Sequence, residues 1–215
     1  MVRVDLHTHT EYSSDSELGL EDAVEGWQRA GIDCVAVTDH NTIAGAIALR
    51  DWAPLRVIVG SEVRTCEGEI IGLFLQEEIA RGLTPEETIR HIRDQQGLVM
   101  IPHPFDRFRR SRLTEEALRR VLAEVDIIEV FNARTAFARD NRRADLLAAE
   151  HGLIPVAGSD SHTAHELGRA YVEMPDFDSP QTFLESLREG RLVKRQSSWF
   201  VHAFTRWAKL RSRFR

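Results

Sequence analysis

Residues 2–10 hold the first side chains whose type and spacing suggest chemistry. Apolar residues alternate there with Asp5, His7 and His9. A period of two predicts a β-strand, and one face of that strand would carry all three polar side chains. Imidazoles two residues apart on one strand face lie roughly 7 Å apart, so they could bind one metal ion or two adjacent ones. Taken alone, the pair is equally well explained as two solvent-exposed polar residues.

Further acidic and imidazole residues stand at the C-terminal ends of later apolar runs. They are His40, Glu62, His103, Glu129, Asp160 and His162. In a parallel α/β barrel those strand ends converge on one mouth, where the active sites of such barrels lie. Structural histidines and helix-capping acids would instead fall on helices and helix starts at least as often. We therefore expect these side chains to meet in one site.

The elements that must position these residues alternate between short apolar runs and helical patterns. The expected strands are 2–10, 34–38, 56–63, 69–75, 98–101, 126–131, 153–158 and 170–174. The expected helices are 18–30, 42–52, 85–96, one beginning near 114, 139–151 and one beginning near 179. Repeated β-α units with apolar strands predict an α/β fold with a parallel sheet covered by helices.

Length and composition are those of one globular domain of the size that α/β barrels use. The chain has 215 residues, of which 42% are hydrophobic and 29% charged. Cys34 and Cys66 are too few for a disulfide framework, and the N-terminus shows no secretion signal, so we expect a cytoplasmic protein. No apolar run approaches the roughly 20 residues that cross a bilayer.

The net charge of −6 conceals an asymmetry. Residues 194–215 hold seven basic side chains and no acid, and removing those seven charges from the total leaves −13 on the rest. An acidic body is a poor general platform for nucleic acid and a reasonable host for divalent cations. We divide the chain into a domain over residues 1–195 and a basic tail over residues 196–215.

Apolar residues of the tail recur near helical spacing: Trp199, Phe200, Phe204, Trp207 and Leu210. They predict an amphipathic helix that could dock on the acidic body, on another subunit to form a homo-oligomer, or on an anionic membrane surface without inserting. Docking on its own barrel is the simplest of the three. Deleting residues 197–215 is expected to change stability or oligomeric state and to spare activity.

Taken together, these motifs resemble the polymerase and histidinol phosphatase (PHP) family of metal-dependent phosphoesterases. The motifs stand in the family's order over residues 3–170: Asp5-Leu6-His7-Thr8-His9, Asp15, Thr38-Asp39-His40, Gly60-Ser61-Glu62, Pro102-His103-Pro104 and Gly158-Ser159-Asp160-Ser161-His162. The resemblance implies a distorted, TIM-like (β/α)7 barrel with a two- or three-metal site on its mouth. It also implies hydrolysis of a phosphate ester.

The resemblance assigns the metal ligands residue by residue: His7, His9, Asp15, His40, Glu62, His103, Asp160 and His162. Glu62 resembles the family's bridging carboxylate, and the residues expected to be central to catalysis are His7, His9, Glu62, Asp160 and His162. Glu69 and Glu129 stand where some members carry other ligands, so a third metal stays open. Glu69 could instead be an exposed acid, Glu129 an inward polar contact, and Asp15 a helix cap.

This ligand set suits the chemistry that the resemblance implies. A phosphate ester repels hydroxide, and two or three close cations remove that repulsion while lowering the pKa of a bound water to roughly 7, which makes a metal-bound hydroxide the expected nucleophile. Imidazole and carboxylate ligands suit Zn, Mn or Fe better than Mg, and the absence of cysteine ligands disfavours a structural zinc site.

Substrate-binding candidates lie just beyond the ligand-bearing strand ends: Arg107, Arg109, Arg134 and His165. Guanidinium groups bind phosphate oxygens well, and we expect this foremost of Arg107 and Arg134. Asp39, beside His40, is expected to orient that imidazole.

Three functions fit these expectations. The first is hydrolysis of a small phosphomonoester or nucleotide phosphate, and the second is a nuclease that trims short oligonucleotides or RNA ends. The third is a non-catalytic metal-binding module, as PHP domains are in some DNA polymerases. A complete ligand set on a free-standing chain disfavours the third, and a substrate panel with Mn and Zn would separate the first two.

Overall fold

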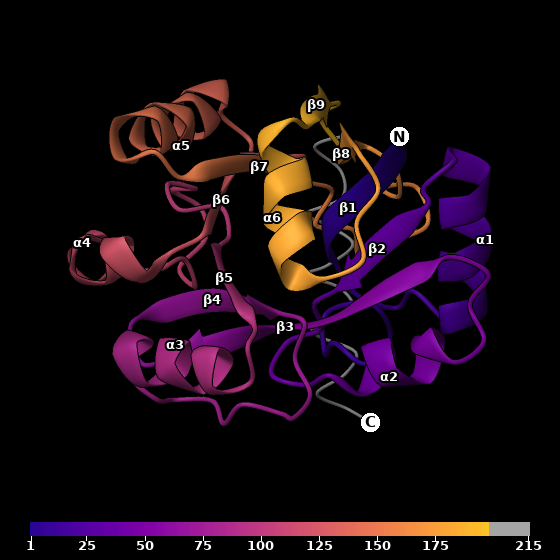
Figure 1. Ribbon diagram of the computed structural model, residues 1–215, viewed down its shortest axis with the longest axis horizontal. Coiled ribbons are helices and arrows are strands. Elements are labelled where there is room, and N and C mark those ends of the chain that lie inside the picture. Colours follow the sequence, from indigo (N-terminus) through magenta and orange to yellow (C-terminus); the bar gives the residue numbers. More distant parts are fainter. Residues whose placement is uncertain (198–215) are drawn as a thin grey trace.

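The computed structural model describes residues 1–197, which form one nine-stranded sheet with helices packed around it (Figure 1). The strands are β1 (Val2–Thr8), β2 (Cys34–Val37), β3 (Arg56–Thr65), β4 (Gly68–Leu73), β5 (Leu98–Ile101), β6 (Ile127–Asn132), β7 (Ile154–Gly158), β8 (Ala170–Met174) and β9 (Arg191–Lys194). The helices are α1 (Leu20–Ala30), α2 (Ala44–Arg50), α3 (Pro85–Asp94), α4 (Glu115–Val121) with the short 3-10 turn η1 (Leu122–Glu124), α5 (Ala138–His151) and α6 (Pro180–Arg188).

The sheet has the order β7-β6-β5-β4-β3-β2-β1-β8-β9 and is mixed rather than parallel. Strands β1, β2, β3, β5, β6 and β7 run in one direction, whereas β4 and β8 run antiparallel to their neighbours. The expectation of an all-parallel sheet is therefore wrong. β4 follows β3 through a tight hairpin turn in which Thr65 pairs with Gly68, and a hairpin reverses the chain without a crossover helix.

The sheet curls until β7 meets β1, which nearly closes a barrel. The amide of His9 donates to the Ser161 carbonyl at 2.9 Å, and the Asp160 amide donates to the His7 carbonyl at 2.7 Å. β1 to β7 thus form the expected distorted, TIM-like barrel of seven strands, and β8 and β9 extend the sheet beyond β1. Since six of the seven strands run the same way, their C-terminal ends share one mouth.

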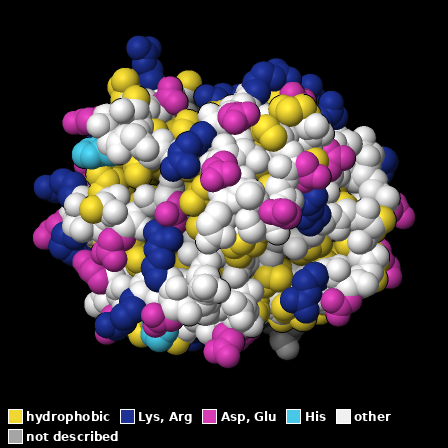
Figure 2. Space-filling model, viewed as in Figure 1, with side chains coloured by type: hydrophobic (Ala, Val, Ile, Leu, Met, Phe, Trp, Pro, Cys, Tyr) yellow, Lys and Arg dark blue, Asp and Glu magenta, His cyan; other side chains and the backbone are white. Residues whose placement is uncertain are grey.

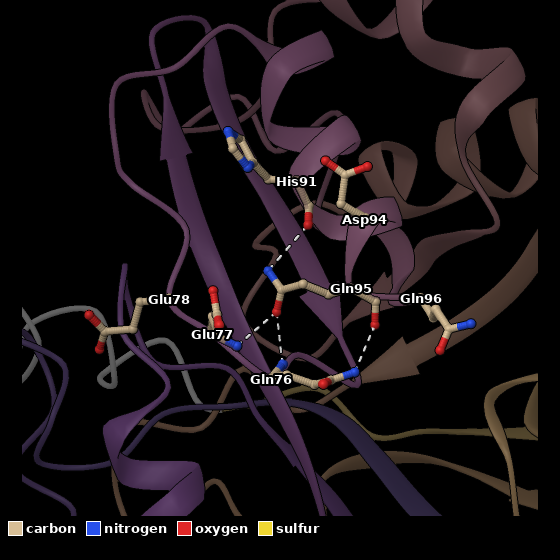
Figure 3. Close-up of a pocket in the computed structure, with 7 residues that line it drawn as sticks. All are labelled: Gln76, Glu77, Glu78, His91, Asp94, Gln95 and Gln96. Atoms are coloured by element: carbon tan, nitrogen blue, oxygen red, sulfur yellow. Dashed lines mark hydrogen bonds between the residues drawn. The ribbon is translucent and has the colours of Figure 1, made fainter.

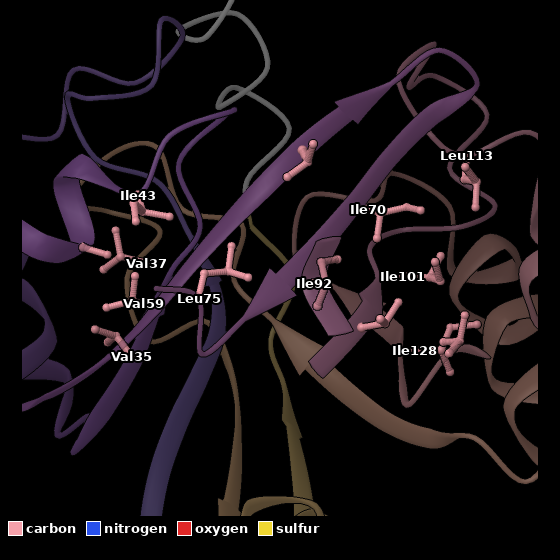
Figure 4. Close-up of a cluster of buried hydrophobic side chains, with 14 of the residues drawn as sticks. Val35, Val37, Ile43, Val59, Ile70, Leu75, Ile92, Ile101, Leu113 and Ile128 are labelled. Atoms are coloured by element: carbon pink, nitrogen blue, oxygen red, sulfur yellow. The ribbon is translucent and has the colours of Figure 1, made fainter. Parts of the chain in front are cut away.

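Apolar side chains pack on both faces of the curled sheet. On the outer face, Val35 and Val37 pack beneath α2, and Ile70 and Ile101 pack with Ile92 of α3 (Figure 4). On the inner face, residues of the parallel strands such as Val4 and Ile58 form a second core with Ile71 and Leu73 of β4, and α6 covers this core with Phe183 and Leu187. The apolar filling occupies the end of the barrel away from the mouth, which leaves the mouth for polar side chains.

Helix boundaries follow the expected end signals. Thr84 accepts from the Glu87 amide in a capping box with Pro85 at the first helical position, and Gly31 ends α1 with a φ of 70°. Within residues 1–197, no helix is long and apolar enough to cross a membrane. Over the face shown in Figure 2, basic and acidic side chains are interspersed.

Candidate metal centre

A β-bulge near the end of β1 determines where its histidines point. Asp5 pairs with Val35, whereas Thr8 pairs only two residues further along β2, so three steps of one strand match two of the other. The extra residue interrupts the alternation and leaves Asp5 and Thr8 on the helix-covered face, beside the valines with which they pair. His7 and His9 therefore face the barrel interior. The expectation that Asp5 shares their face is wrong.

Glu62 of β3 lies at the centre of four imidazole rings. Its Oε1 is 3.1 Å from His103 Nε2, and its Oε2 is 3.2 Å from His40 Nδ1, 3.4 Å from His9 Nε2 and 3.6 Å from His7 Nε2. The carboxylate is fully buried. One carboxylate shared among four imidazole nitrogens from three chain segments is the arrangement that a bridging ligand needs.

Asp160, just after β7, forms a second meeting point. Its Oδ1 lies 3.5 Å from His9 Nε2, 3.5 Å from His162 Nδ1 and 3.8 Å from His7 Nε2. Its Oδ2 accepts a hydrogen bond from Asn132 Nδ2 at 3.0 Å. The Asn132 contact fixes the carboxylate so that Oδ1 faces the imidazoles.

Asp15 belongs to the same cluster although it comes from the loop between β1 and α1. Its Oδ1 lies 3.4 Å from His40 Nε2 and 3.5 Å from His162 Nε2. The helix-cap alternative is wrong, because α1 begins after Gly19 and has no side-chain cap. Eight sequence-predicted ligands, from His7 to His162, thus lie together at the mouth.

Glu129 of β6 contacts the cluster from behind. Its Oε1 is 3.1 Å from His7 Nδ1, and its Oε2 accepts from the His103 amide at 2.7 Å and from Asn132 Nδ2 at 3.0 Å. A carboxylate on the far nitrogen of an imidazole fixes the ring and its tautomer. Glu129 therefore makes the inward polar contact and leaves His7 Nε2 free to face Glu62.

Glu69 of β4 is buried rather than exposed, since only 5% of its surface is accessible. One of its carboxylate oxygens groups with ligand atoms of His40 and Glu62, all within 4.8 Å of one another. Its Oε1 also lies 3.4 Å from Arg64 Nη1. The alternative of an exposed strand-end acid is wrong. Glu69 lies where its carboxylate could bind a metal ion together with His40 and Glu62.

Two buried carboxylate oxygens test whether metal ions fit this cluster. Within residues 1–197, Glu62 Oε2 and Asp160 Oδ1 accept no hydrogen bond, although imidazole nitrogens surround both. A buried carboxylate oxygen without a hydrogen bond is costly, and a cation between it and the imidazoles removes that cost. The combinations with three close ligand atoms are His9-His40-His162, His7-Glu62-His103, His7-His9-Asp160 and His40-Glu62-Glu69. The side chains present therefore fit divalent metal ions.

Charge within the cluster is arranged to keep its carboxylates ionised. Burial disfavours the charged imidazole of His7, but Asp160, Glu129 and Glu62 outweigh burial and raise the pKa of His7 well above its usual value. Burial also opposes ionisation of Glu62, yet the neighbouring imidazoles of His7 and His40 hold the pKa of Glu62 well below its usual range. A site that attracts protons so strongly without a metal is a site where cations bind well.

His162 behaves differently from His7. Burial, followed by the positive charge of Arg134, lowers the pKa of His162 to about 3. Its ring is therefore neutral at physiological pH, and Nδ1 lies 2.8 Å from the Asp160 carbonyl. A neutral imidazole has the lone pair that metal ligation requires.

Two of the predicted ligands sit on strained backbone. His103 has a φ of 27° and Asp160 a φ of 52°, in the region that non-glycine residues rarely adopt. Such residues cost on the order of 1–3 kcal/mol each and persist where the surrounding structure fixes them. Each lies two residues beyond the end of its strand, β5 or β7, and the positive φ turns its side chain back into the mouth.

Asp39 has another role than the one expected from its position. It accepts from the Thr10 amide and hydroxyl, both at 2.7 Å, and from the Ser13 hydroxyl at 2.7 Å. Ser13 Oγ in turn lies 3.2 Å from His9 Nδ1 and accepts from the His40 amide. Asp39 thus fixes the loop after β1 and, through Ser13, the His9 ring, instead of orienting the His40 imidazole.

Among the predicted substrate-binding residues, Arg107 lies outside the cluster. Its guanidinium pairs with Asp140 at the start of α5. Arg109, which ranked lower from sequence, reaches the cluster instead: it contacts the Asp160 carboxylate and lies 3.3 Å from His103 Nε2. The sequence signal for Arg109 is only its place in the loop after β5, which it shares with three other arginines.

Arg134 reaches the cluster and His165 does not. Arg134 is 4% exposed, with Nη1 2.6 Å from His162 Nδ1 and Nε 3.1 Å from Glu166 Oε1. Glu166 Oε2 accepts from the His162 amide at 3.1 Å, so it supports both the arginine and the imidazole. His165 is exposed. Sequence reasoning missed Glu166 and Asn132, because neither stands in a ligand motif.

A hollow on the surface lies away from the histidine cluster. It has a volume of about 360 Å³ and is lined by Gln76, Glu77, Glu78, His91, Asp94, Gln95 and Gln96 (Figure 3). Gln95 crosses it, accepting from the Gln76 and Glu77 amides at 2.8 Å. The Gln76 and Gln95 side chains bond backbone groups of the hollow itself, and none of its lining residues belongs to the metal centre.

Sequence comparisons relate this chain to one family profile and to two uncharacterised proteins. A family profile described as PHP-associated matches residues 138–192. An uncharacterised protein of Methanocaldococcus jannaschii is 34% identical over 228 residues, which cover 99% of this chain and 92% of that protein. A second uncharacterised protein of that organism is 41% identical over 146 residues, covering 61% of this chain and 82% of the other.

Solved structures share the fold at low sequence identity. A protein assigned as a metal-dependent phosphoesterase from Bifidobacterium adolescentis has a TM-score of 0.63 at 18% identity, with coverage of 86% of this chain and 95% of that one. The lesion-specific endonuclease of Pyrococcus furiosus has a TM-score of 0.68 at 18% identity, with coverage of 89% and 57%. Fold, ligand geometry and relatives together define the class: this chain belongs to the PHP family.

Proposed function

We propose that the protein is a metal-dependent phosphoesterase that hydrolyses a small phosphomonoester or a nucleotide phosphate. The observation that carries the proposal is the shared carboxylate Glu62, whose unbonded Oε2 lies 3.2–3.6 Å from three imidazole nitrogens. Two ligand groups that share a carboxylate suit adjacent cations, and adjacent cations suit phosphate esters. PHP membership, which the comparisons show, supports this function.

The residues of this chain have separable tasks in that reaction. His7, His9, Glu62, Asp160 and His162 would hold the metals at the centre, with Asp15, His40 and His103 around them. When bound, divalent metals neutralise phosphate charge and acidify water. Arg109, at the Asp160 side of the cluster, supplies a guanidinium for a phosphate oxygen of the substrate.

The donor set favours Zn, Mn or Fe, in two or three sites. Imidazole nitrogen predominates over oxygen among the ligands, which suits these metals better than Mg. Whether the cluster binds two metal ions or three depends on Glu69, because Glu69 completes the ligand group that contains His40 and Glu62. Metal analysis of the purified protein and of a Glu69→Gln variant gives the number directly, with one metal lost per chain if Glu69 is a ligand.

A substrate panel tests the proposed activity. Protein freed of metal and reloaded with Mn or Zn is expected to hydrolyse an aryl phosphate, and a chelator should abolish turnover. An Arg109→Ala variant should keep its metals and lose on the order of 2 kcal/mol of transition-state stabilisation, as for a charge-assisted hydrogen bond. Arg50→Ala, on the exposed end of α2, is the matched control. No metal bound on adding Mn or Zn would overturn the proposal.

A nuclease is the second candidate. Arg110 is exposed in the loop after β5 and Arg139 in the first turn of α5, and neither has a carboxylate within 4.0 Å among residues 1–197. Free cations near a phosphoesterase site suit a longer phosphate backbone. Short oligonucleotides in the same panel decide between the candidates, and a metal-loaded protein that hydrolyses neither class would be a non-catalytic module.

A further inference from the structure

We propose that the mouth carries a stacking site for the base of a nucleotide-type substrate, formed by Phe108 with Phe137 beside it. This inference rests on the proposed function and specifies its substrate class. Phe108 lies in the loop after β5 and Phe137 in the loop after β6, both at the C-terminal ends of barrel strands.

Both rings are exposed to solvent although they contact each other. Phe108 is 65% exposed and Phe137 40%, and their ring centroids are 5.6 Å apart with planes inclined by 32°. A single exposed apolar residue is ordinary, but two neighbouring aromatic rings form a patch that suits a ligand. Since Phe108 has the larger open surface, its ring is the one that can receive a planar group.

The loop that carries Phe108 also reaches the proposed metal centre. Arg109 follows Phe108 in sequence, and its guanidinium contacts the Asp160 carboxylate and lies 3.3 Å from His103 Nε2. A substrate whose phosphate is held by Arg109 and the metals can therefore extend its other end over Phe108. That end is planar and aromatic in a nucleotide, and it is neither in a simple sugar phosphate.

Contacts between the two loops hold the aromatic pair in place. Arg107 Nε donates to Asp140 Oδ2 at 2.9 Å, and the Arg107 guanidinium lies over the Phe137 ring at 5.1 Å. The Thr135 hydroxyl donates to Asp106 Oδ2 at 3.4 Å, which is a second link between the loops. A surface fixed before binding loses little entropy when a ligand stacks on it.

The charge around the pair matches a nucleotide. Arg110 is exposed, and Arg139 lies 5.1 Å over the Phe137 ring, both without a carboxylate partner among the described residues. Aromatic rings interleaved with unpaired arginines are the usual surface for single-stranded nucleic acid components, since bases stack and phosphates pair with the cations. An apolar partner protein would bury the two rings favourably but would leave the arginines without a charged partner.

The test compares a nucleotide with the same phosphate lacking its base. With Mn-loaded full-length protein, kcat/KM is measured for a nucleoside 5′-monophosphate and for ribose 5-phosphate. We expect the ratio of the two kcat/KM values, nucleotide over ribose 5-phosphate, to be greater than one. This ratio should fall about tenfold in Phe108→Ala, because one base-stacking contact contributes a factor of about that size. Phe108→Tyr keeps an aromatic face and should restore most of the ratio.

Trp52→Ala is the matched control. Trp52 is 49% exposed in the turn between α2 and β3, at the end of the barrel away from the mouth. Its loss should leave the ratio unchanged. A wild-type ratio near one, or a ratio that Phe108→Ala does not lower, overturns the stacking site even if both esters are hydrolysed.

Failure of the proposed function gives a different result. If neither ester is hydrolysed, equilibrium binding of the nucleoside monophosphate and of ribose 5-phosphate to the Mn-loaded protein replaces kinetics. Tighter binding of the nucleotide that Phe108→Ala weakens would sustain the stacking site without catalysis, and equal binding would remove it. A change in oligomeric state of Phe108→Ala with an unchanged ratio would assign the rings to contact between copies of the chain.

Discussion

At the scale of single residues, the cluster divides into side chains that face its centre and side chains that orient them. Glu62 and Asp160 each present an oxygen without a hydrogen bond to the imidazoles, whereas Glu129 and Asn132 use their polar atoms on the ligands themselves. The first group could be predicted from sequence, because its members stand in recognisable motifs. In the second group, the sequence singled out Glu129 but left ligation and an inward polar contact open, and it did not single out Asn132, since nothing in the local sequence shows which nitrogen or oxygen these side chains contact.

Alanine at a central ligand should remove metal and turnover together. Asp160→Ala loses the oxygen that lies 3.5 Å from both His9 Nε2 and His162 Nδ1, and His9→Ala loses the opposing nitrogen. We expect both variants to bind fewer metals per chain and to lose at least 100-fold in kcat, since metal and activity are linked. Metal analysis beside kinetics measures this. His151→Ala, at the exposed end of α5, is the control, and full metal content in Asp160→Ala would contradict the assignment.

Glu129→Gln tests an orienting residue without changing its size. Glu129 Oε2 accepts from the His103 amide and from Asn132 Nδ2, and an amide NH2 at that place would face two donors. We expect metal affinity to fall roughly 10- to 100-fold while the fold persists, as for other groups behind metal ligands. Competition against a metal chelator measures the affinity. Unchanged affinity would mean that His7 needs no support from behind.

At the scale of elements, hydrophobic periodicity located the strands and helices well and their directions poorly. Strand 98–101 and strand 170–174 are found as predicted, and other boundaries shift by a few residues. The reversed direction of β4 and β8 and the short β9 were missed, because an antiparallel strand buried on both faces reads like a parallel one. The bulge in β1 was missed because it breaks the period of two that predicted the strand.

Gly158, the last residue of β7, should tolerate no side chain. A Cβ there would lie 2.3 Å from Glu129 Oε1 and 2.7 Å from His7 Cβ, so the metal centre would have to move. Gly158→Ala is expected to destabilise the fold by about 1–3 kcal/mol, as overpacking does, and to lower metal content. Gly19→Ala is the control, since its Cβ would meet nothing closer than 3.8 Å. Urea unfolding with metal analysis measures both effects, and two equally stable variants would refute the packing argument.

At the scale of the whole molecule, the metal centre couples the first strand to the last strands of the barrel. The ligands come from β1 and β3 and from the loops that follow β1, β2, β5 and β7, so ions bound there would join the two ends of the curled sheet. A ligand that binds only the folded state stabilises it, by about 2.7 kcal/mol at a concentration 100 times its dissociation constant.

Metal removal should therefore lower the melting temperature. Thermal unfolding of metal-loaded and chelator-treated protein is expected to differ by several degrees for a chain of this length. The Asp160→Ala variant should show a smaller difference, which separates specific binding from a general effect of the chelator. Identical melting temperatures with and without Mn or Zn would show that the cluster holds no metal in the folded protein.

The predicted helix of the tail lies outside the described residues, but residues assigned to the start of the tail pack on the barrel. The Ser197 amide donates to the Ala133 carbonyl at 2.8 Å, and Gln196 Nε2 donates to the Thr135 carbonyl at 2.9 Å. These bonds lie on either side of Arg134 in the loop after β6. The contacts of the barrel therefore extend at least through Ser197.

Truncation before and after Gln196 and Ser197 should have different effects. A chain that ends at residue 197 is expected to keep its metals and its kcat, whereas one that ends at residue 194 loses both hydrogen bonds to the Arg134 loop. The chain that ends at residue 194 keeps a complete β9 strand, so we expect it to fold. Its stability should be about 1–3 kcal/mol lower and its KM for phosphate esters higher. Urea unfolding and kinetics of the two truncated proteins measure this. Selective loss of activity in the chain that ends at residue 197 would instead make the tail a part of the active site.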